Sequence, residues 1–468
     1  MLYPPWASDL LDGHPQIENG AMLQRPKSNV SSICQKIERY LLCILLASLL
    51  IAVPKGLQSS TLIHGTTKTA EPSNVDERVD RILSETPLFD GHNDLAWQIR
   101  EKYLNQIYQE NFTKPFIHGG FPGHVDLPRL AKGRVGGTFW SLYVKCPTNW
   151  MDFSSANYAL RVRQTMDQVD VMTRLQHAYP DVFSTPPNSS TALQAWKDGK
   201  IISPLGIEGL HSIGNSYAQL REFYQLGVSY AILTHDCHNL YADAAQAELP
   251  DGTLTKAHPF WHGISEAGKK LVWEMNRLGM IVDLAHVSAD TMRDVLGGGK
   301  DDWPGSLAPV IFSHSSEYAL CPHPRNVPDD VLQLVKRKNS LVMVNFYSYF
   351  VSCTKSDRPD GMPDPDHEHA TLEHVADHIE YIGNLIGYSH VGLGSDFNGV
   401  DILCHGLEDV SKFPSLIAEL LKRGISDEDV SKVAGGNLLR VWKEVDQVAL
   451  KMREEGALPV EDTLVDLN

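Results

Sequence analysis

From about residue 79 onward, the chain alternates short apolar runs with longer segments whose apolar residues recur every three or four positions. The short runs predict strands of a parallel sheet, because strands buried on both faces are almost uniformly apolar. The longer segments predict amphipathic helices, as Leu271, Met275 and Leu278 illustrate. Eight strands are expected, at residues 87–91, 137–144, 201–207, 229–234, 280–285, 309–313, 340–346 and 391–395.

Helix-length segments separate these strands. The clearest lie at residues 157–179, 264–278, 371–386 and 413–423. Eight strand–helix units favour a closed (β/α)₈ TIM barrel over an open, doubly wound sheet. We therefore expect an α/β fold with a single catalytic domain over residues 79–450, followed by a C-terminal tail at 451–468.

The N-terminal region has a different pattern. Residues 1–39 form a polar leader, and residues 40–54 an apolar segment that follows Lys36 and Arg39. Its uncharged part, 14 residues long, is short for a membrane-spanning helix and suits the core of a signal peptide. A short signal anchor and a buried core helix are the alternatives. Residues 55–78, rich in Gly, Ser, Thr and Lys, are expected to form a stalk.

This arrangement places the catalytic domain outside the cytosol, because the basic residues precede the apolar segment. The protein is then expected in the secretory pathway. It would be a type II membrane protein if the segment is retained, and secreted if the segment is cleaved. Two glycosylation sequons, at Asn111 and Asn188, lie in the part expected outside the cytosol.

Composition excludes some functions. The net charge of −17 argues against nucleic acid as a partner, because phosphate binding needs a basic surface. The chain also lacks a Walker loop and a G-x-G-x-x-G turn, which lowers the case for a nucleotide.

Polar residues capable of chemistry occur where the expected strands end. Active sites of (β/α)₈ barrels lie at the carboxyl ends of the strands, so these side chains should meet on one rim. The residues are His92, Asp94, Glu208, His235, His286, His314 and Asp396.

Four histidines and three carboxylates exceed what one zinc ion needs, since a catalytic zinc uses three protein ligands. Two metal ions joined by a carboxylate and a water use the set better. Glu208 is the expected bridge, with His92 and Asp94 on one ion and His286 and His314 on the other. His235 and Asp396 would then be catalytic, as an oxyanion stabiliser and as a proton-transferring or ammonium-binding carboxylate.

The chain resembles the membrane (renal-type) dipeptidases, a branch of the metal-dependent amidohydrolase superfamily. The resemblance covers residues 79–442. It rests on the motifs DGHND, GIEGLHSIG, LTHDC, IVDLAHVS, PVIFSHSS, CPHPRNVPDD, LVMVNFY, VGLGSDFNGV and GLEDVSKFPSLIAELL.

The resemblance implies a dinuclear zinc site held by His92, Asp94, Glu208, His286 and His314, bridged by Glu208. It also implies substrate contacts from His235, Arg325 and Asp396, and disulfides Cys146–Cys237 and Cys321–Cys353. The expected substrates are dipeptides of broad specificity, with a D-residue tolerated at the C-terminal position. Cys404 is left over and is expected to be buried or free, and a homodimer is possible.

One departure concerns specificity. Many relatives have Asp-Phe-Asp-Gly after the eighth strand, whereas this chain has Asn398 in place of the second aspartate.

Two other functions stay open. Another amidohydrolase, such as a phosphotriesterase or deaminase, usually has His-x-His on strand one. A catalytically silent binding protein would lack a ligand or the His235 equivalent.

Overall fold

The computed structural model describes residues 74–249, 251–299 and 301–463. The expected leader, the apolar segment at 40–54 and most of the stalk lie outside these residues. Residues 75–78, assigned to the stalk, begin a helix, α3 (Val75–Glu85). Within the described part of the chain, no helix combines the length and apolarity required to span a membrane.

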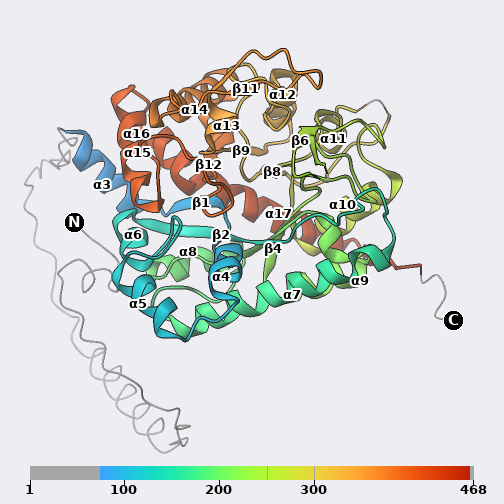
Figure 1. Cartoon of the computed structure of the whole chain (residues 1–468), viewed down its shortest axis with the longest axis horizontal. Helices are drawn as coiled ribbons and strands as arrows, with labels where there is room; N and C mark the ends of the chain where they lie inside the picture. Colours follow the sequence, from blue (N-terminus) through green and yellow to red (C-terminus); the bar gives the residue numbers. More distant parts are fainter. Residues whose placement is uncertain (1–73, 250, 300, 464–468) are drawn as a thin grey trace, which may run out of the picture. The chain divides into compact units, whose positions relative to one another are not determined.

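The core of the structure is a closed parallel barrel of eight strands (Figure 1). Around the barrel the order is β1-β12-β9-β8-β7-β4-β3-β2, so β1 and β12 close the ring. The strands are β1 (Leu88–Asn93), β2 (Val135–Tyr143), β3 (Leu205–Glu208), β4 (Val228–Ile232), β7 (Ile281–Asp283), β8 (Ile311–Phe312), β9 (Leu341–Val344) and β12 (Val391–Leu393).

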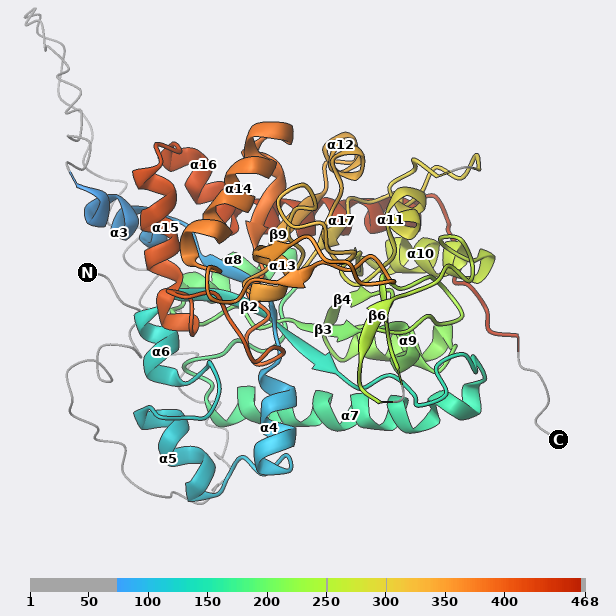
Figure 2. The ribbon, with the colours of Figure 1, turned by 45° about the horizontal axis from the view of Figure 1, so that its top comes forward.

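Helices surround the barrel, and the long α7 (Ser155–Ala178) runs beside β2 (Figure 2). Every connection between consecutive barrel strands includes at least one helix, as is usual between parallel strands. The helices are α4 (Leu95–Tyr103), α5 (Glu110–His118), α6 (Leu127–Lys132), α7 (Ser155–Ala178), α8 (Ser189–Lys197), α9 (Tyr217–Gln225), α10 (Glu266–Leu278), α11 (Ala289–Val295), α12 (Asp329–Arg337), α13 (Ser348–Val351), α14 (Leu372–Ile386), α15 (Phe413–Lys422), α16 (Asp427–Ser431) and α17 (Asn437–Glu454).

The predicted barrel is confirmed, and each of the eight expected strands overlaps an observed one. Several observed strands are shorter than expected. The shortest, β8, has only two residues. The periodic pattern missed two short hairpins, β5–β6 (Gln246–Glu248 and Leu254–Lys256) and β10–β11 (Cys353–Thr354 and Asp364–Pro365). Two- and three-residue strands are too short to show a period.

Aromatic side chains fill the barrel interior. Phe139 packs against three other rings, with its centroid 5.3 Å from Phe89, 4.8 Å from Tyr230 and 5.5 Å from Trp442 of α17. All four are buried, so the interior is a packed core and not a channel. The chemistry is therefore confined to the rim where the strands end.

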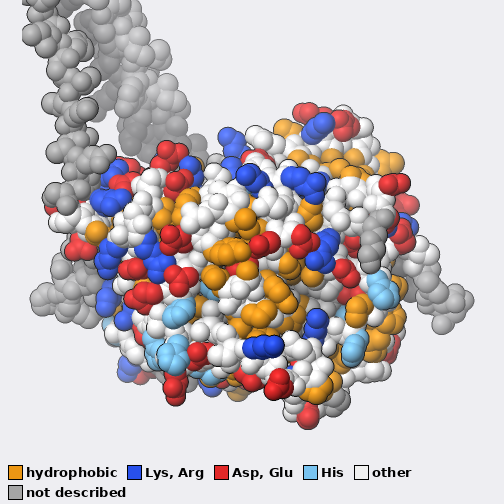
Figure 3. Space-filling view, turned by 90° about the horizontal axis from the view of Figure 1, so that it is seen from above, with side chains coloured by type: hydrophobic (Ala, Val, Ile, Leu, Met, Phe, Trp, Pro, Cys, Tyr) orange, Lys and Arg blue, Asp and Glu red, His pale blue; other side chains and the backbone are white. Residues whose placement is uncertain are grey.

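The surface is mixed in charge. On the face seen in Figure 3, the described basic side chains stand next to acidic ones, and hydrophobic side chains gather near the centre of the view.

Candidate metal centre and substrate cavity

The structure brings together the five side chains expected to bind metal, at the carboxyl ends of four strands. His92 and Asp94 come from the end of β1, Glu208 from β3, His286 from the turn after β7 and His314 from the turn after β8. Glu208 lies in the middle. Its Oε2 is 3.5 Å from His92 Nε2, and its Oε1 is 3.0 Å from His286 Nε2 and 3.7 Å from His314 Nε2.

These residues form two groups of three ligands that share Glu208. The potential ligand atoms of His92, Asp94 and Glu208 lie within 4.8 Å of one another, and so do those of Glu208, His286 and His314. Asp94 Oδ1 is buried and accepts no hydrogen bond from the described residues. A buried acceptor without a donor is costly, and a cation would satisfy it. Imidazole and carboxylate ligands fit zinc, so the donor set suits two such ions.

The second nitrogen of each histidine is held by a neighbouring side chain. His92 Nδ1 lies 2.9 Å from the Tyr230 hydroxyl, His286 Nδ1 lies 3.1 Å from Asp236 Oδ1, and His314 Nδ1 lies 2.9 Å from Ser313 Oγ. These contacts orient all three Nε2 atoms towards Glu208. Outer contacts of this kind fix ring orientation in metal sites.

Tyr230 reaches His92 because β3 has a glycine beside it. A Cβ at Gly206 would lie 2.1 Å from the Tyr230 ring. No other residue at this position would leave the phenol in place, so a glycine inside the strand supports the orientation of a candidate ligand on β1.

The carboxylates experience opposing effects. Burial by itself would raise the pKa of Glu208, but the charge of His92 and hydrogen bonds from His286 and His92 lower it well below its usual range. Burial raises the pKa of Asp94, and the nearby charge of Glu208 adds to this. Burial likewise raises the pKa of Asp396 to about 7, with Asp94 and Glu208 contributing. A divalent cation among them would favour the ionised forms.

Three of the metal-ligand candidates, Asp94, Glu208 and His286, line a cavity of about 630 Å³. His235, Arg325 and Asp396 line the same cavity. His235 follows β4, and its Nε2 lies 3.8 Å from Glu208 Oε1. Asp396 follows β12, and its Oδ2 accepts a hydrogen bond of 3.1 Å from Asn345 Nδ2. All three expected substrate-contacting residues therefore lie around one space.

Arg325 is the most unusual of these residues. It is 0% exposed, and its Nε, Nη1 and Nη2 have no hydrogen-bond acceptor among the described residues. The guanidinium lies 5.0 Å from the centre of the Phe350 ring. A buried cation without hydrogen bonds is strongly disfavoured, so the site is suited to an anion that arrives through the cavity.

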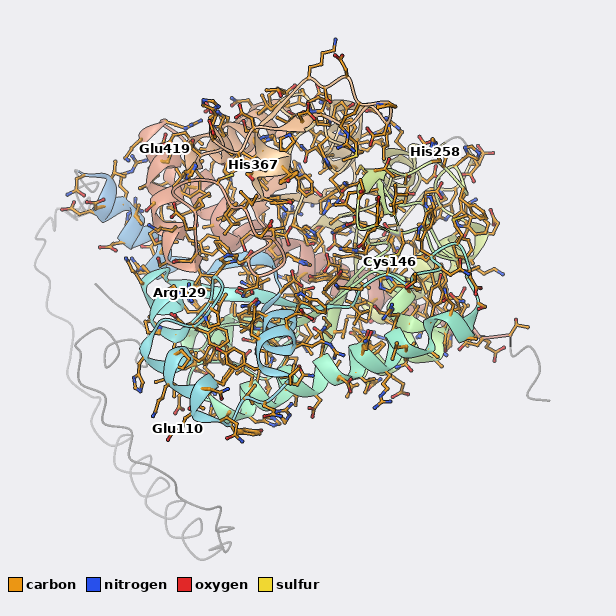
Figure 4. All side chains as sticks on the ribbon, viewed as in Figure 1. Glu110, Arg129, Cys146, His258, His367 and Glu419 are labelled. Carbon is orange, nitrogen blue, oxygen red and sulfur yellow. A yellow bond between two sulfur atoms is a disulfide. The ribbon has the colours of Figure 1, made fainter. Side chains whose placement is uncertain are left out.

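Both expected disulfides are confirmed. Cys146, labelled in Figure 4, pairs with Cys237 at a Cα–Cα distance of 6.2 Å, and Cys321 pairs with Cys353 at 5.4 Å. Cys237 is two residues from His235, so the first disulfide ties the β4 end to the segment after β2. Cys404 is free and buried, as expected.

The two sequons lie on the surface. Asn111 is exposed in α5, and Asn188 is exposed at the N-cap of α8, where its Oδ1 accepts hydrogen bonds from the backbone of Ser190 and Thr191. The Asn188 side-chain nitrogen is not used in the cap. Glycosylation at both positions stays a prediction.

The sequence analysis did not identify Asp236. Its Oδ1 bonds His286, and its Oδ2 lies 3.9 Å from His235 Nδ1. In the sequence it stands directly after His235, within the LTHDC motif.

We expect Asp236→Asn to lower the affinity of the candidate centre for a divalent metal ion by about 10- to 100-fold, because the amide supports the His286 ring less strongly than a carboxylate. Competition with a metal indicator, with zinc as the added ion, measures this affinity. The control is Asp360→Asn, a carboxylate paired with Arg358 outside the centre. Equal metal affinity in Asp236→Asn and the native protein would contradict a role of Asp236 in orienting His286.

The comparisons with known proteins agree with this geometry. The family model described as membrane dipeptidase (peptidase family M19) matches residues 76–456. The dipeptidase aclJ of Aspergillus oryzae is 46% identical over 387 residues, covering 82% of this chain and 83% of its own. The dipeptidase tcpJ of Claviceps purpurea is 44% identical over 381 residues, covering 81% of each.

Solved structures share the fold. The probable dipeptidase PvdM of Pseudomonas aeruginosa superimposes with a TM-score of 0.68 at 22% identity, over 80% of this chain and 99% of its own. A metallopeptidase of Rhodobacter sphaeroides, solved with a phosphinate mimic of L-Ala-D-Ala, gives a TM-score of 0.63 at 23% identity, over 77% and 99%. From the family match and the curated relatives together, the chain belongs to the membrane dipeptidases, the metal-dependent peptidase family M19.

Proposed function

We propose that this protein is a zinc-dependent dipeptidase that binds two zinc ions, bridged by Glu208. The observation that carries the proposal is the shared cavity, which is lined by members of both ligand groups and by an unpartnered buried guanidinium. The ligands suit hydrolysis, and the guanidinium suits a substrate with a free carboxylate.

The protein's own residues define the substrate by its two charged ends. Arg325 binds the C-terminal carboxylate through parallel hydrogen bonds, which a guanidinium makes well. Asp396 holds the N-terminal ammonium or passes a proton. A longer peptide would leave one of these charges unpaired, and this limits the substrate to two residues.

The zinc ions, when bound, supply activation of water at neutral pH. His235 faces the same space and donates a hydrogen bond to the oxygen of the scissile carbonyl as negative charge develops there. His92, His286 and His314 keep their Nε2 atoms turned inward through Tyr230, Asp236 and Ser313. The reaction involves no covalent bond between substrate and protein.

A D-residue at the C-terminal position is also part of the proposal. The fold neighbour from Rhodobacter sphaeroides was solved with a phosphinate mimic of L-Ala-D-Ala, and this supports tolerance of such a residue. Recognition by Arg325 depends on the carboxylate and not on the side chain, so broad specificity follows.

The two disulfides support an oxidising compartment, because such bonds form mainly in secreted and lumenal proteins. The protein is therefore proposed to enter the secretory pathway, anchored through residues 40–54 if that segment is retained and secreted otherwise.

The test is hydrolysis of glycyl-L-leucine and glycyl-D-leucine with and without a chelator, followed by zinc addition. We expect both to be cleaved, activity to be lost with the chelator and restored by zinc, and glycyl-glycyl-leucine to be resistant. Metal analysis should give two zinc ions per chain. Two bound ions without cleavage of either dipeptide would exclude a dipeptidase and favour a different amide substrate or a binding protein.

A further inference from the structure

Asn398 lies two residues beyond Asp396, on the turn that follows β12. It lines the substrate cavity and is only 8% exposed. Its backbone φ of 67° is in the left-handed region, which asparagine tolerates better than most residues. The side chain is therefore held in the wall of the cavity.

The orientation of the Asn398 amide is fixed by its neighbour. The His124 backbone N–H donates to Asn398 Oδ1 at 2.8 Å, and the Asn398 backbone N–H donates to His124 Nδ1 at 2.8 Å. Because an N–H must meet an acceptor, the oxygen faces His124 and the NH₂ group faces away. Asn398 Nδ2 is buried and has no hydrogen-bond partner in the described structure.

The segment that holds this amide is itself anchored. Arg129, labelled in Figure 4, donates to the carbonyl oxygens of Gly123 at 2.6 Å and Phe121 at 2.7 Å. The Val410 backbone N–H donates to the His124 carbonyl at 3.2 Å. These contacts on both sides of His124 hold in place the backbone N–H that donates to Asn398 Oδ1.

The same turn encloses the carboxylates of the centre. A Cβ at Gly399 would lie 2.4 Å from Asp94 Oδ2 and 2.5 Å from Asp396 Oδ1. Asn398 therefore adds an unpaired donor to a cavity that Asp94 and Asp396 line with acceptors. A substrate ammonium has only donors, so it can bind Asp396 but cannot pair with this NH₂ group.

We infer that Asn398 Nδ2 donates a hydrogen bond to an oxygen on the side chain of the substrate's N-terminal residue. The inference rests on the proposed dipeptidase function and on Asp396 holding the ammonium attached to the same carbon. Asn398 is then a specificity-determining residue. The favoured substrates are dipeptides with an uncharged, oxygen-bearing N-terminal residue, such as serine, threonine, asparagine or glutamine.

Two matched dipeptides test this. O-methylseryl-glycine and norvalyl-glycine differ only by an ether oxygen in place of a methylene group, and this oxygen can accept but not donate. We expect the native full-length protein to cleave the ether dipeptide with a kcat/KM about ten-fold higher, the effect of one hydrogen bond to an otherwise unpaired buried donor.

Two variants change the donor, and both tolerate the left-handed backbone. Asn398→Asp keeps the acceptor for His124 and replaces the donor with a second acceptor, so the ratio should fall to one or below. Asn398→Gly removes the side chain, and its ratio should be close to one. The control is Asn105→Asp, which makes the same change at a residue with φ of 61° that does not line the cavity, and it should keep the native ratio.

Thermal unfolding and zinc content show whether each variant is folded. The ratio of the two kcat/KM values in the native protein tests the inference even if a variant does not fold. If this ratio is near one in the native protein and glycyl-L-leucine is cleaved, the inference about Asn398 is overturned but the proposed function is not. An unchanged ratio in folded Asn398→Asp would overturn it as well. Failure to cleave any of the three dipeptides would instead overturn the proposed function.

Discussion

Replacing Glu208 with glutamine should lower kcat/KM for glycyl-L-leucine by about 10³-fold or more, since several kcal/mol of metal-dependent stabilisation is lost. Glu208 is the shared member of both ligand groups, and its two oxygens face three histidines. An amide has the same shape but offers only one acceptor, so it cannot bridge two cations. We also expect fewer than two zinc ions per chain by elemental analysis.

The matched control is Glu248→Gln. Glu248 lines the same cavity, but it belongs to neither ligand group. Its backbone bond to the Asp236 carbonyl does not depend on the side chain. The control should keep two zinc ions and most of its activity. If Glu208→Gln retained both ions and native kinetics, the bridging role would be wrong and the centre would have to be assigned to other ligands.

The part of the site that lies on strands was predictable. His92 and Glu208 end apolar runs, and His286 and His314 follow such runs within three residues. A parallel barrel brings all its carboxyl ends to one rim, so the register of a strand is enough to place a residue there. Strand recognition therefore located the candidate metal ligands without knowledge of their side-chain conformations.

The contacts around the ligands were not predictable in this way. That Asp236 bonds His286, and Tyr230 bonds His92, depends on side-chain conformations and on space left by Gly206. The unpaired Asn398 NH₂ group depends on a loop 274 residues away in sequence. Such pairings follow from tertiary packing, which a single sequence does not encode in any local pattern.

The burial of Arg325 could not be predicted from the sequence either. It lies between β8 and α12, in a segment tied by the Cys321–Cys353 disulfide, and the resemblance alone singled it out. By spacing it would be an exposed loop residue, yet the structure buries it completely. Burial lowers the pKa of its guanidinium even though Asp236 and Asp396 attract the charge, so the surroundings disfavour the cation on balance.

Arg325→Met should therefore separate activity from stability. We expect kcat/KM for dipeptides to fall by about 10²- to 10³-fold, as for the loss of a buried charged partner. The free energy of unfolding should rise by about 1–4 kcal/mol, because a well-packed apolar side chain replaces a buried charge without hydrogen bonds. Steady-state kinetics and urea unfolding measure the two effects on the same preparation.

The control, Arg221→Met, should show the reverse. Arg221 Nη1 lies 3.0 Å from Glu274 Oε1, and Glu274 is fully buried, so removing the cation leaves a buried carboxylate with less support. That variant should lose stability and keep its activity. If Arg325→Met were instead destabilised, the guanidinium would have acceptors within the folded protein. Its burial could then not be explained by a role in binding the substrate carboxylate. A site that costs stability until substrate arrives is the signature expected of a residue retained for binding.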